Sequence, residues 1–230
     1  MIPFDADFGK YKLVVAPVLY MVREGMEEAL EKFVENGGIL VITYMSGIVG
    51  QSDNVHLGGY PGPLKKLAGV WVEEIDALAP GQYNEVVMSS GEKYSCSLLC
   101  DLMHLEGAQS LGTYAEDFYQ GMPAVTRNCF GEGFAYYVGT RMSKEGLSFI
   151  LDKAAADAAV ESVGQETEGL EIVCRQTEDS RIYFVMNFEN QERRMPLWLC
   201  HNRDLLSGEM VSEDTMLRKY DVYIIQIRNG

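Results

Sequence analysis

The first part of the chain alternates between apolar runs and one amphipathic segment. Residues 12–17 and 39–44 are almost entirely apolar, which is typical of strands covered on both faces of a sheet. Between them, residues 23–36 place Met26, Leu30 and Phe33 on one helical face, and a pair of glycines then ends the helix. The pattern predicts a parallel strand–helix–strand unit, which belongs to a larger sheet.

After a glycine-rich excursion at residues 46–63, the pattern changes to shorter strands. A short helix is expected after Pro63, and a longer helix over residues 143–160 is expected to be capped by Ser143. Together these elements predict an α/β domain over residues 1–162, with a partial flavodoxin-like, mostly parallel sheet and helices. The strands expected between the two helices are residues 70–75, 94–104, 109–114, 124–128 and 134–139.

A polar break at residues 164–169 is the predicted boundary between two domains. Beyond it, every apolar segment resembles a strand, so residues 168–230 are expected to form a small antiparallel all-β, sandwich-like domain. A domain of that size has a thin core and is usually stabilised by packing on a neighbour. Its expected strands are residues 170–176, 181–188, 194–199, 205–209 and 220–227.

Composition and charge narrow the class of protein. The 230 residues are 47% apolar and carry 19 basic against 34 acidic side chains, which gives a net charge of −15. That charge opposes binding to nucleic acid or to an anionic membrane, so neither is expected as a partner. The first residues lack the features of a signal peptide, and five cysteines, an odd number, favour reduced thiols. We therefore expect a cytoplasmic protein.

Two patterns suggest chemistry, and a less specific explanation is favoured for each. Ser46 follows a buried strand, where α/β enzymes place a nucleophile, but the Gly-x-Ser-x-Gly pattern is absent and a loop-ordering hydroxyl is expected. Cys96, Cys100 and His104 recur every four residues, as zinc ligands on a helix would. The same segment also alternates like a strand and lacks a Cys-x-x-Cys pair, so we expect buried thiols and no metal.

Tryptophan and arginine side chains leave similar alternatives open. Trp71 and Trp198 could stack on a sugar, but each lies in a strand-like run, which favours packing in a core or between domains. Arg127 and Arg141 are expected to be solvated charges.

Several sequence blocks in the same order resemble the β-galactosidases of glycoside hydrolase family 42. The resemblance covers essentially the whole chain. The blocks are YKLVVAP at 11–17, YMSGIV at 44–49, HLGGYPGPL at 56–64, LEGA at 105–108, DFY at 117–119, PAVTRN at 123–128, AYYVGT at 135–140, DLLSGE at 204–209 and YDV at 220–222.

The resemblance implies an enzyme of three parts: a catalytic (β/α)₈ barrel, an α/β trimerisation domain similar to class I glutamine amidotransferases in fold, and a C-terminal β domain. This chain matches the last two and is expected to lack the first strand and helix of the trimerisation domain. An unpaired sheet edge or an uncovered sheet face is then expected near residues 13–16. A barrel takes about 250 residues, more than this chain has, so no catalytic, cofactor-binding or metal-binding residue is assigned.

The implied role is non-catalytic assembly of an enzyme that hydrolyses terminal β-D-galactose from β-galactosides by a retaining mechanism. Homo-oligomers are the expected partners: a trimer in the family, which could differ for this chain, with the galactoside bound only by the full-length enzyme. The alternatives are a stand-alone enzyme of glutamine amidotransferase-like fold and a sugar-binding module. Two loops are expected to contact the barrel or another subunit, although turn chemistry alone would also explain them: His56, Gly58, Gly59, Tyr60, Pro61, Asp117, Phe118 and Tyr119.

Overall fold

The computed structural model describes residues 6–161, 163 and 169–228. Most of the polar break expected at 164–169 therefore lies outside the described residues. The chain divides into two compact units, Met1–Glu161 and Ser162–Gly230, each of which is described by itself.

The first unit opens with the predicted parallel strand–helix–strand unit. A short 3₁₀ turn, η1 (Phe8–Lys10), leads to β1 (Leu13–Ala16), helix α1 (Met26–Glu35) and β2 (Ile39–Thr43). β1 and β2 pair in parallel, with Leu13 opposite Ile39. The periodicity of the apolar positions therefore gave the correct type for all three elements.

The sheet of this unit is mixed, with strands in the order β1-β2-β8-β7-β6-β4-β5-β3 and β9 paired to β5. This confirms the α/β class, but the pairing is mostly antiparallel, because only β1–β2 and β2–β8 run parallel. The physical reason is that parallel neighbours need a long crossover, whereas many of these strands are joined by tight turns. The remaining strands are β3 (Val70–Ala77), β4 (Asn84–Met88), β5 (Lys93–Leu105), β6 (Gln109–Tyr114), β7 (Pro123–Phe130), β8 (Gly133–Val138) and β9 (Thr140–Met142).

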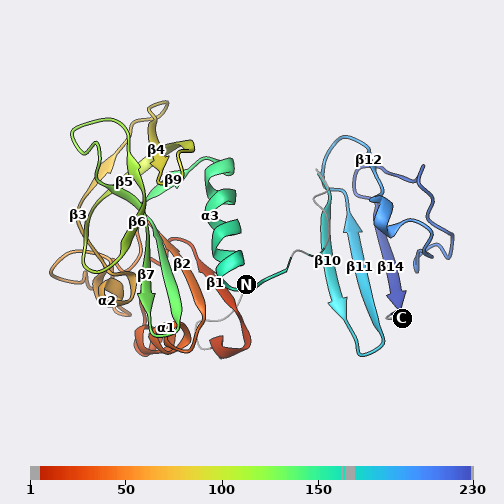
Figure 1. Cartoon of the computed structure of the whole chain (residues 1–230), viewed down its shortest axis with the longest axis horizontal. Helices are drawn as coiled ribbons and strands as arrows, with labels where there is room; N and C mark the ends of the chain where they lie inside the picture. The colour runs from red at the N-terminus through yellow and green to blue at the C-terminus, as the bar shows by residue number, and fades with distance from the viewer. Residues whose placement is uncertain (1–5, 162, 164–168, 229–230) are drawn as a thin grey trace. The chain divides into compact units, whose positions relative to one another are not determined.

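Figure 1 shows helices on different sides of the sheet that contains β2. Residues of these helices and of β2 together form two hydrophobic clusters. Alternate residues of β2 point to opposite faces, so Leu40 and Ile42 join the α1 side while Ile39 and Val41 join the other. The α1 side also receives the predicted short helix, which is formed by η2 (Gly62–Leu64) and α2 (Lys65–Ala68). The other side is covered by α3 (Lys144–Asp157), whose N-cap is Ser143 as predicted: its Oγ accepts a hydrogen bond from the Gly146 N–H at 3.2 Å.

Strand β1 forms one end of the sheet. Among the described residues it pairs only with β2, and the Val15 side chain is 44% exposed. The expectation of an unpaired edge near residues 13–16 is confirmed. Such an edge leaves backbone N–H and C=O groups free to pair with another strand.

The second unit is antiparallel β structure. β10 (Glu171–Gln176), β11 (Ser180–Met186) and β14 (Val222–Arg228) form a three-stranded sheet, and β12 (Arg193–Arg194) pairs with β13 (Met216–Leu217). Two predicted strands are wrong. Residues 197–199 form the 3₁₀ turn η3 (Leu197–Leu199), and residues 205–209 form turns in which the Asp204 carboxylate accepts hydrogen bonds from the N–H groups of Leu206 and Ser207.

Candidate functional site

The glycine-rich loop after β2 folds back on the segment that follows β1. The Gly47 N–H donates to the Leu19 carbonyl at 2.8 Å, and the Ile48 N–H donates to the Tyr20 carbonyl at 2.9 Å. Gly47 has a φ of +66°, and a Cβ there would lie only 2.0 Å from the Pro61 carbonyl oxygen. Only glycine allows the two arms of the loop to approach so closely.

Ser46 is fully buried inside this loop, and its contacts are with the backbone. Its Oγ donates a hydrogen bond to the Thr43 carbonyl at 2.6 Å and accepts one from the Leu19 N–H at 3.1 Å. Both contacts hold the ends of β1 and β2 to the loop. The structure thus favours the loop-ordering role that the sequence indicated over a nucleophile.

We expect Ser46→Ala to destabilise the chain by about 1–3 kcal/mol, because it leaves the partly buried Leu19 N–H without its acceptor. Urea unfolding measures this, with Ser52→Ala as the matched control at an exposed position of the same loop. The control should change stability by less than about 0.5 kcal/mol. Equal midpoints for the two variants would contradict the proposed role of Ser46.

The predicted contact residues of this loop divide into exposed and packed positions. Gly58 is exposed, while Pro61 is buried and the His56 ring is half-buried, with its Nε2 making no hydrogen bond to any residue that the structure describes. Tyr60 is half-buried: it packs on the core, and its carbonyl accepts a hydrogen bond from the Val72 N–H at 2.8 Å. Gly59 lies against Trp71, because a Cβ there would be 2.0 Å from the indole Nε1.

The most exposed apolar residue of the loop is not among the predicted contact residues. Leu57 is 95% exposed, and Val55 in the same loop is 55% exposed. Val18 and Tyr20, on the segment that the loop contacts, are also exposed. A leucine between a histidine and two glycines gives no periodic signal, so its exposure could not have been predicted from the pattern.

The residues of the second predicted contact segment, Asp117–Tyr119, also differ in exposure. Asp117 has a φ of +72°, and its Oδ1 accepts a hydrogen bond from the Phe118 N–H at 2.7 Å. This turn leaves Phe118 73% exposed and buries Tyr119, whose hydroxyl donates to Asp76 Oδ2 at 3.0 Å. Phe118 is therefore the only side chain of the three that is both aromatic and available for contact.

The two predicted contact segments meet β3 at different positions. Tyr60 pairs with Val72 near the start of that strand, whereas Tyr119 bonds to Asp76 near its end. They therefore contribute two separate exposed points, Leu57 and Phe118.

The candidate metal ligands do not converge. Cys96 and Cys100 are buried in the core, whereas His104 is exposed, stacks on Trp71 with ring centroids 4.9 Å apart, and contacts Glu73 Oε2 at 2.7 Å. In the part of the chain that the structure describes, no group of three histidine, cysteine, aspartate or glutamate residues could hold a metal ion. No helix formed by the described residues is long and apolar enough to cross a bilayer.

Arg127 is not the solvated charge that was expected. Its Nη1 lies 2.9 Å from Asp157 Oδ2, with both side chains about three-quarters buried, and its guanidinium lies 4.4 Å from the centroid of the Phe134 ring. The pair ties β7 to the end of α3, so its role is structural. Arg141, in contrast, is exposed on β9.

The carboxyl group of Asp101 has a strongly raised pKa, but it is buried inside the sheet. It is 1% exposed, its Oδ2 accepts a hydrogen bond from the Tyr137 hydroxyl at 2.8 Å, and its Oδ1 has no partner among the described residues. Burial away from water raises the pKa of Asp101 to about 7, and the Tyr137 hydrogen bond opposes that rise only in part. A perturbed carboxyl in a cleft would be a candidate acid or base, but this one has no access to a substrate.

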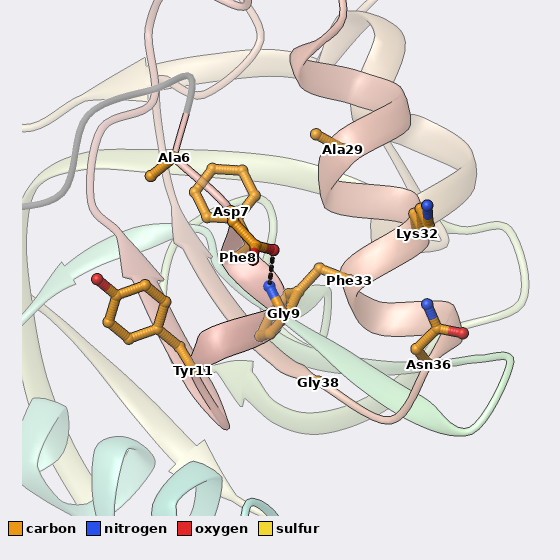
Figure 2. Close-up of a pocket in the computed structure, with 10 residues that line it drawn as sticks. All are labelled: Ala6, Asp7, Phe8, Gly9, Tyr11, Ala29, Lys32, Phe33, Asn36 and Gly38. Carbon is orange, nitrogen blue, oxygen red and sulfur yellow. Dashed lines mark hydrogen bonds between the residues drawn. The ribbon is translucent and has the colours of Figure 1, made fainter.

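A groove of about 260 Å³ lies between the N-terminal segment and α1. Figure 2 shows the residues that line it. Phe8 and Phe33 pack edge to face there, with ring centroids 6.3 Å apart. Lys32 and Asn36 supply polar groups, and the Asp7 carboxylate accepts the Gly9 N–H at 3.0 Å.

Comparisons with known proteins agree on one kind of relative. The β-galactosidase trimerisation domain family matches residues 1–161, and the β-galactosidase C-terminal domain family matches residues 169–226. β-Galactosidase LacA of Lactobacillus acidophilus is 47% identical over 227 residues, which are 98% of this chain and 34% of the relative. β-Galactosidase Pbg of Clostridium perfringens is 43% identical over 98% of this chain and 34% of the relative.

A solved structure gives the same correspondence. The β-galactosidase from Bacillus circulans sp. alkalophilus superposes with a TM-score of 0.88 and 38% identity, over 97% of this chain and 34% of that one. The chain thus spans about a third of the length of the relatives that it matches.

Proposed function

Because the chain belongs to the β-galactosidases of glycoside hydrolase family 42 through its trimerisation and C-terminal domains, we propose that it is the assembly portion of such an enzyme. Its role is to associate with further copies, and hydrolysis of terminal β-D-galactose is carried out by the parent enzyme outside this chain. The observation that carries this proposal is the match of 98% of the chain to 34% of β-galactosidase LacA.

The chemistry of the described residues supports a non-catalytic role. Retaining glycosidases need two carboxyl groups about 5–5.5 Å apart, with the pKa of one of them raised, on either side of the scissile bond. Burial raises the pKa of the Asp101 carboxyl group to about 7, but that group is only 1% exposed. Ser46, the candidate nucleophile of a stand-alone enzyme, is committed to backbone contacts.

The proposal places the contacts with other subunits, or with the barrel of the parent enzyme, at two positions. Leu57 and Phe118 are exposed apolar side chains held by ordered turns, and an exposed aromatic anchor is a frequent centre of a protein interface. Other residues of the two loops attach the loops to β3. Gly59 lies against Trp71, and the Tyr60 backbone bonds to Val72. The Tyr119 hydroxyl bonds to Asp76.

The same proposal includes the cellular setting. A net charge of −15 supports a protein partner over nucleic acid or an anionic membrane. Five cysteines, an odd number, support a reducing, cytoplasmic environment.

An assay with a chromogenic β-galactoside tests whether this chain hydrolyses β-galactosides by itself. We expect the purified chain to give no turnover above the rate of the buffer, because Asp101, whose carboxyl pKa is raised to about 7, is buried away from any substrate. A full-length family enzyme serves as the positive control, and Ser46→Ala serves as the matched variant. Saturable hydrolysis by the chain would overturn the proposal, and its loss in Ser46→Ala would indicate the stand-alone enzyme instead.

A further inference from the structure

Two cysteines that are four positions apart in β5 are brought close together by a bulge. In a regular strand, Cys96 and Cys100 would lie about 13 Å apart. Here the pairing of β5 with β9 shifts between Ser97 and Cys100, and Leu98 takes a φ of +72°. As a result, Cys96 lies opposite Met142 while Cys100 lies opposite Thr140.

The register places both thiols on one face. Met142 and Thr140 are two residues apart on β9, so they point to the same side of the sheet and their Cα atoms are about 7 Å apart. Cys96 and Cys100 face that same side, because directly opposite residues in an antiparallel pair share a face. An equal Cα separation for Cys96 and Cys100 would be just beyond the roughly 4.4–6.8 Å that disulfides usually span, so the bulge must close slightly for the two sulfurs to join.

The surroundings of the pair distinguish the two thiols. Both belong to one core cluster, and Cys100 Sγ lies 3.7 Å from Thr140 Oγ1. A hydrogen bond from the Cys96 thiol, helped by Tyr119 and Thr140, lowers the pKa of Cys100 to about 7 despite its burial. The hydrogen bond to Cys100 and burial raise the pKa of Cys96, so Cys100 ionises first.

A hollow of about 320 Å³ borders the bulge and is lined in part by Ser97, Leu98 and Arg141. Leu98 is 45% exposed, whereas Cys96 and Cys100 are 2% and 0% exposed, so a small oxidant reaches the two sulfurs only when the bulge opens. Small outward movements of the bulge, which interrupts the β5–β9 ladder, would expose Cys100.

We propose that Cys96 and Cys100 form a redox-active dithiol that hydrogen peroxide converts into an intramolecular disulfide. The Cys100 thiolate attacks one peroxide oxygen, the O–O bond breaks, and hydroxide leaves to become water with the proton that Cys100 released. The Cys96 thiol then attacks the resulting sulfenic acid, the S–O bond breaks, and a second water leaves. Both sulfurs are oxidised and the peroxide is reduced; a small-molecule thiol reverses the reaction.

The disulfide would restrict the bulge in β5 to one conformation opposite β9. Because this chemistry lies within the first unit, it does not depend on the proposed role in assembly.

Peptide mapping of the intact chain tests this proposal. Trypsin releases residues 94–127 as one peptide that contains Cys96 and Cys100 and no other cysteine. After treatment with hydrogen peroxide and alkylation in denaturant, we expect this peptide to be two hydrogen atoms lighter than the dithiol and to carry no alkyl group. Dithiothreitol should restore two alkylation sites.

Three variants distinguish a disulfide between Cys96 and Cys100 from unspecific oxidation of the cysteines. Cys129→Ser removes an exposed cysteine and should leave the light peptide unchanged, whereas Cys100→Ala and Cys96→Ala should each abolish it. Two alkyl groups on the 94–127 peptide of the treated chain would overturn the proposal. So would oxygen added to Cys100 while Cys96 remains alkylatable.

Discussion

Asp101→Asn should remove a large pH dependence from the stability of the first unit. Aspartate has a pKa of about 3.9 in an unfolded chain. Burial raises the pKa of Asp101 to about 7 in the folded chain, so between these values the folded state holds a proton that the unfolded state has released. The stability contributed by the neutral carboxyl is therefore fully present below about pH 4 and is lost as the pH rises through about 7.

The size of this effect follows from the shift in pKa. A rise of about three units corresponds to about 4 kcal/mol of stability lost between about pH 4 and about pH 8. Asparagine does not ionise, so the variant does not undergo this loss of stability over the same pH range. This holds whatever the stability of the variant is at acidic pH. The groups that face Asp101, which are Tyr137, Tyr114 and Cys100, remain in both proteins.

Urea unfolding at several pH values measures the difference between the two proteins. We expect the free energy of unfolding of Asp101→Asn to fall less than that of the original chain between about pH 5 and about pH 8. Asp117→Asn is a matched control, because Asp117 lies in an exposed turn. Parallel pH profiles for the original chain and Asp101→Asn would show that the carboxyl ionises as it does in water.

Gly133→Ala should destabilise the first unit by about 3 kcal/mol, at the upper end of what overpacking costs. A Cβ at Gly133 would lie 2.2 Å from the Gly38 carbonyl oxygen and 2.4 Å from the Val34 carbonyl oxygen. Both atoms belong to the backbone where α1 ends and turns into β2. No side-chain rotation relieves this clash, so either α1 or β8 must move.

Thermal unfolding measures this effect, with Gly50→Ala as the control. A Cβ at Gly50 would lie 3.5 Å from the His56 ring and 3.9 Å from the Asn54 carbonyl oxygen, both ordinary contact distances. For a unit of this size, about 3 kcal/mol lowers the midpoint by roughly 6–12 °C, whereas the control should change by less than about 2 °C. Equal midpoints would mean that α1 does not pack on the start of β8 as closely as described.

Local patterns predicted the elements whose structure depends on local residues. The apolar positions of α1, the Ser143 cap and the apolar runs of β1 and β2 are properties of neighbouring residues, and all were predicted correctly. The direction of strand pairing was not, because it depends on how each strand is connected. A tight turn joins β4 to β5 and another joins β7 to β8, and both pairs are antiparallel, which contradicts a mostly parallel sheet.

Exposure within the two contact loops was harder to predict. The sequence indicated both loops, but Tyr60 packs on the core and Tyr119 is buried, while Leu57 and Phe118 extend into solvent. The orientation of these side chains follows from long-range contacts with β3, which the residues of the loop do not encode. Arg127 shows the same limit, since its partner Asp157 is 30 positions away.

Self-association is the property that most directly distinguishes an assembly unit from an independent enzyme or a sugar-binding module. Multi-angle light scattering over a range of protein concentrations measures the molar mass of the purified chain without reference to any substrate. We expect a whole multiple of the chain mass of 25.7 kDa, with the trimer of the family as the first candidate. A mass of 25.7 kDa at every concentration would contradict the assembly role.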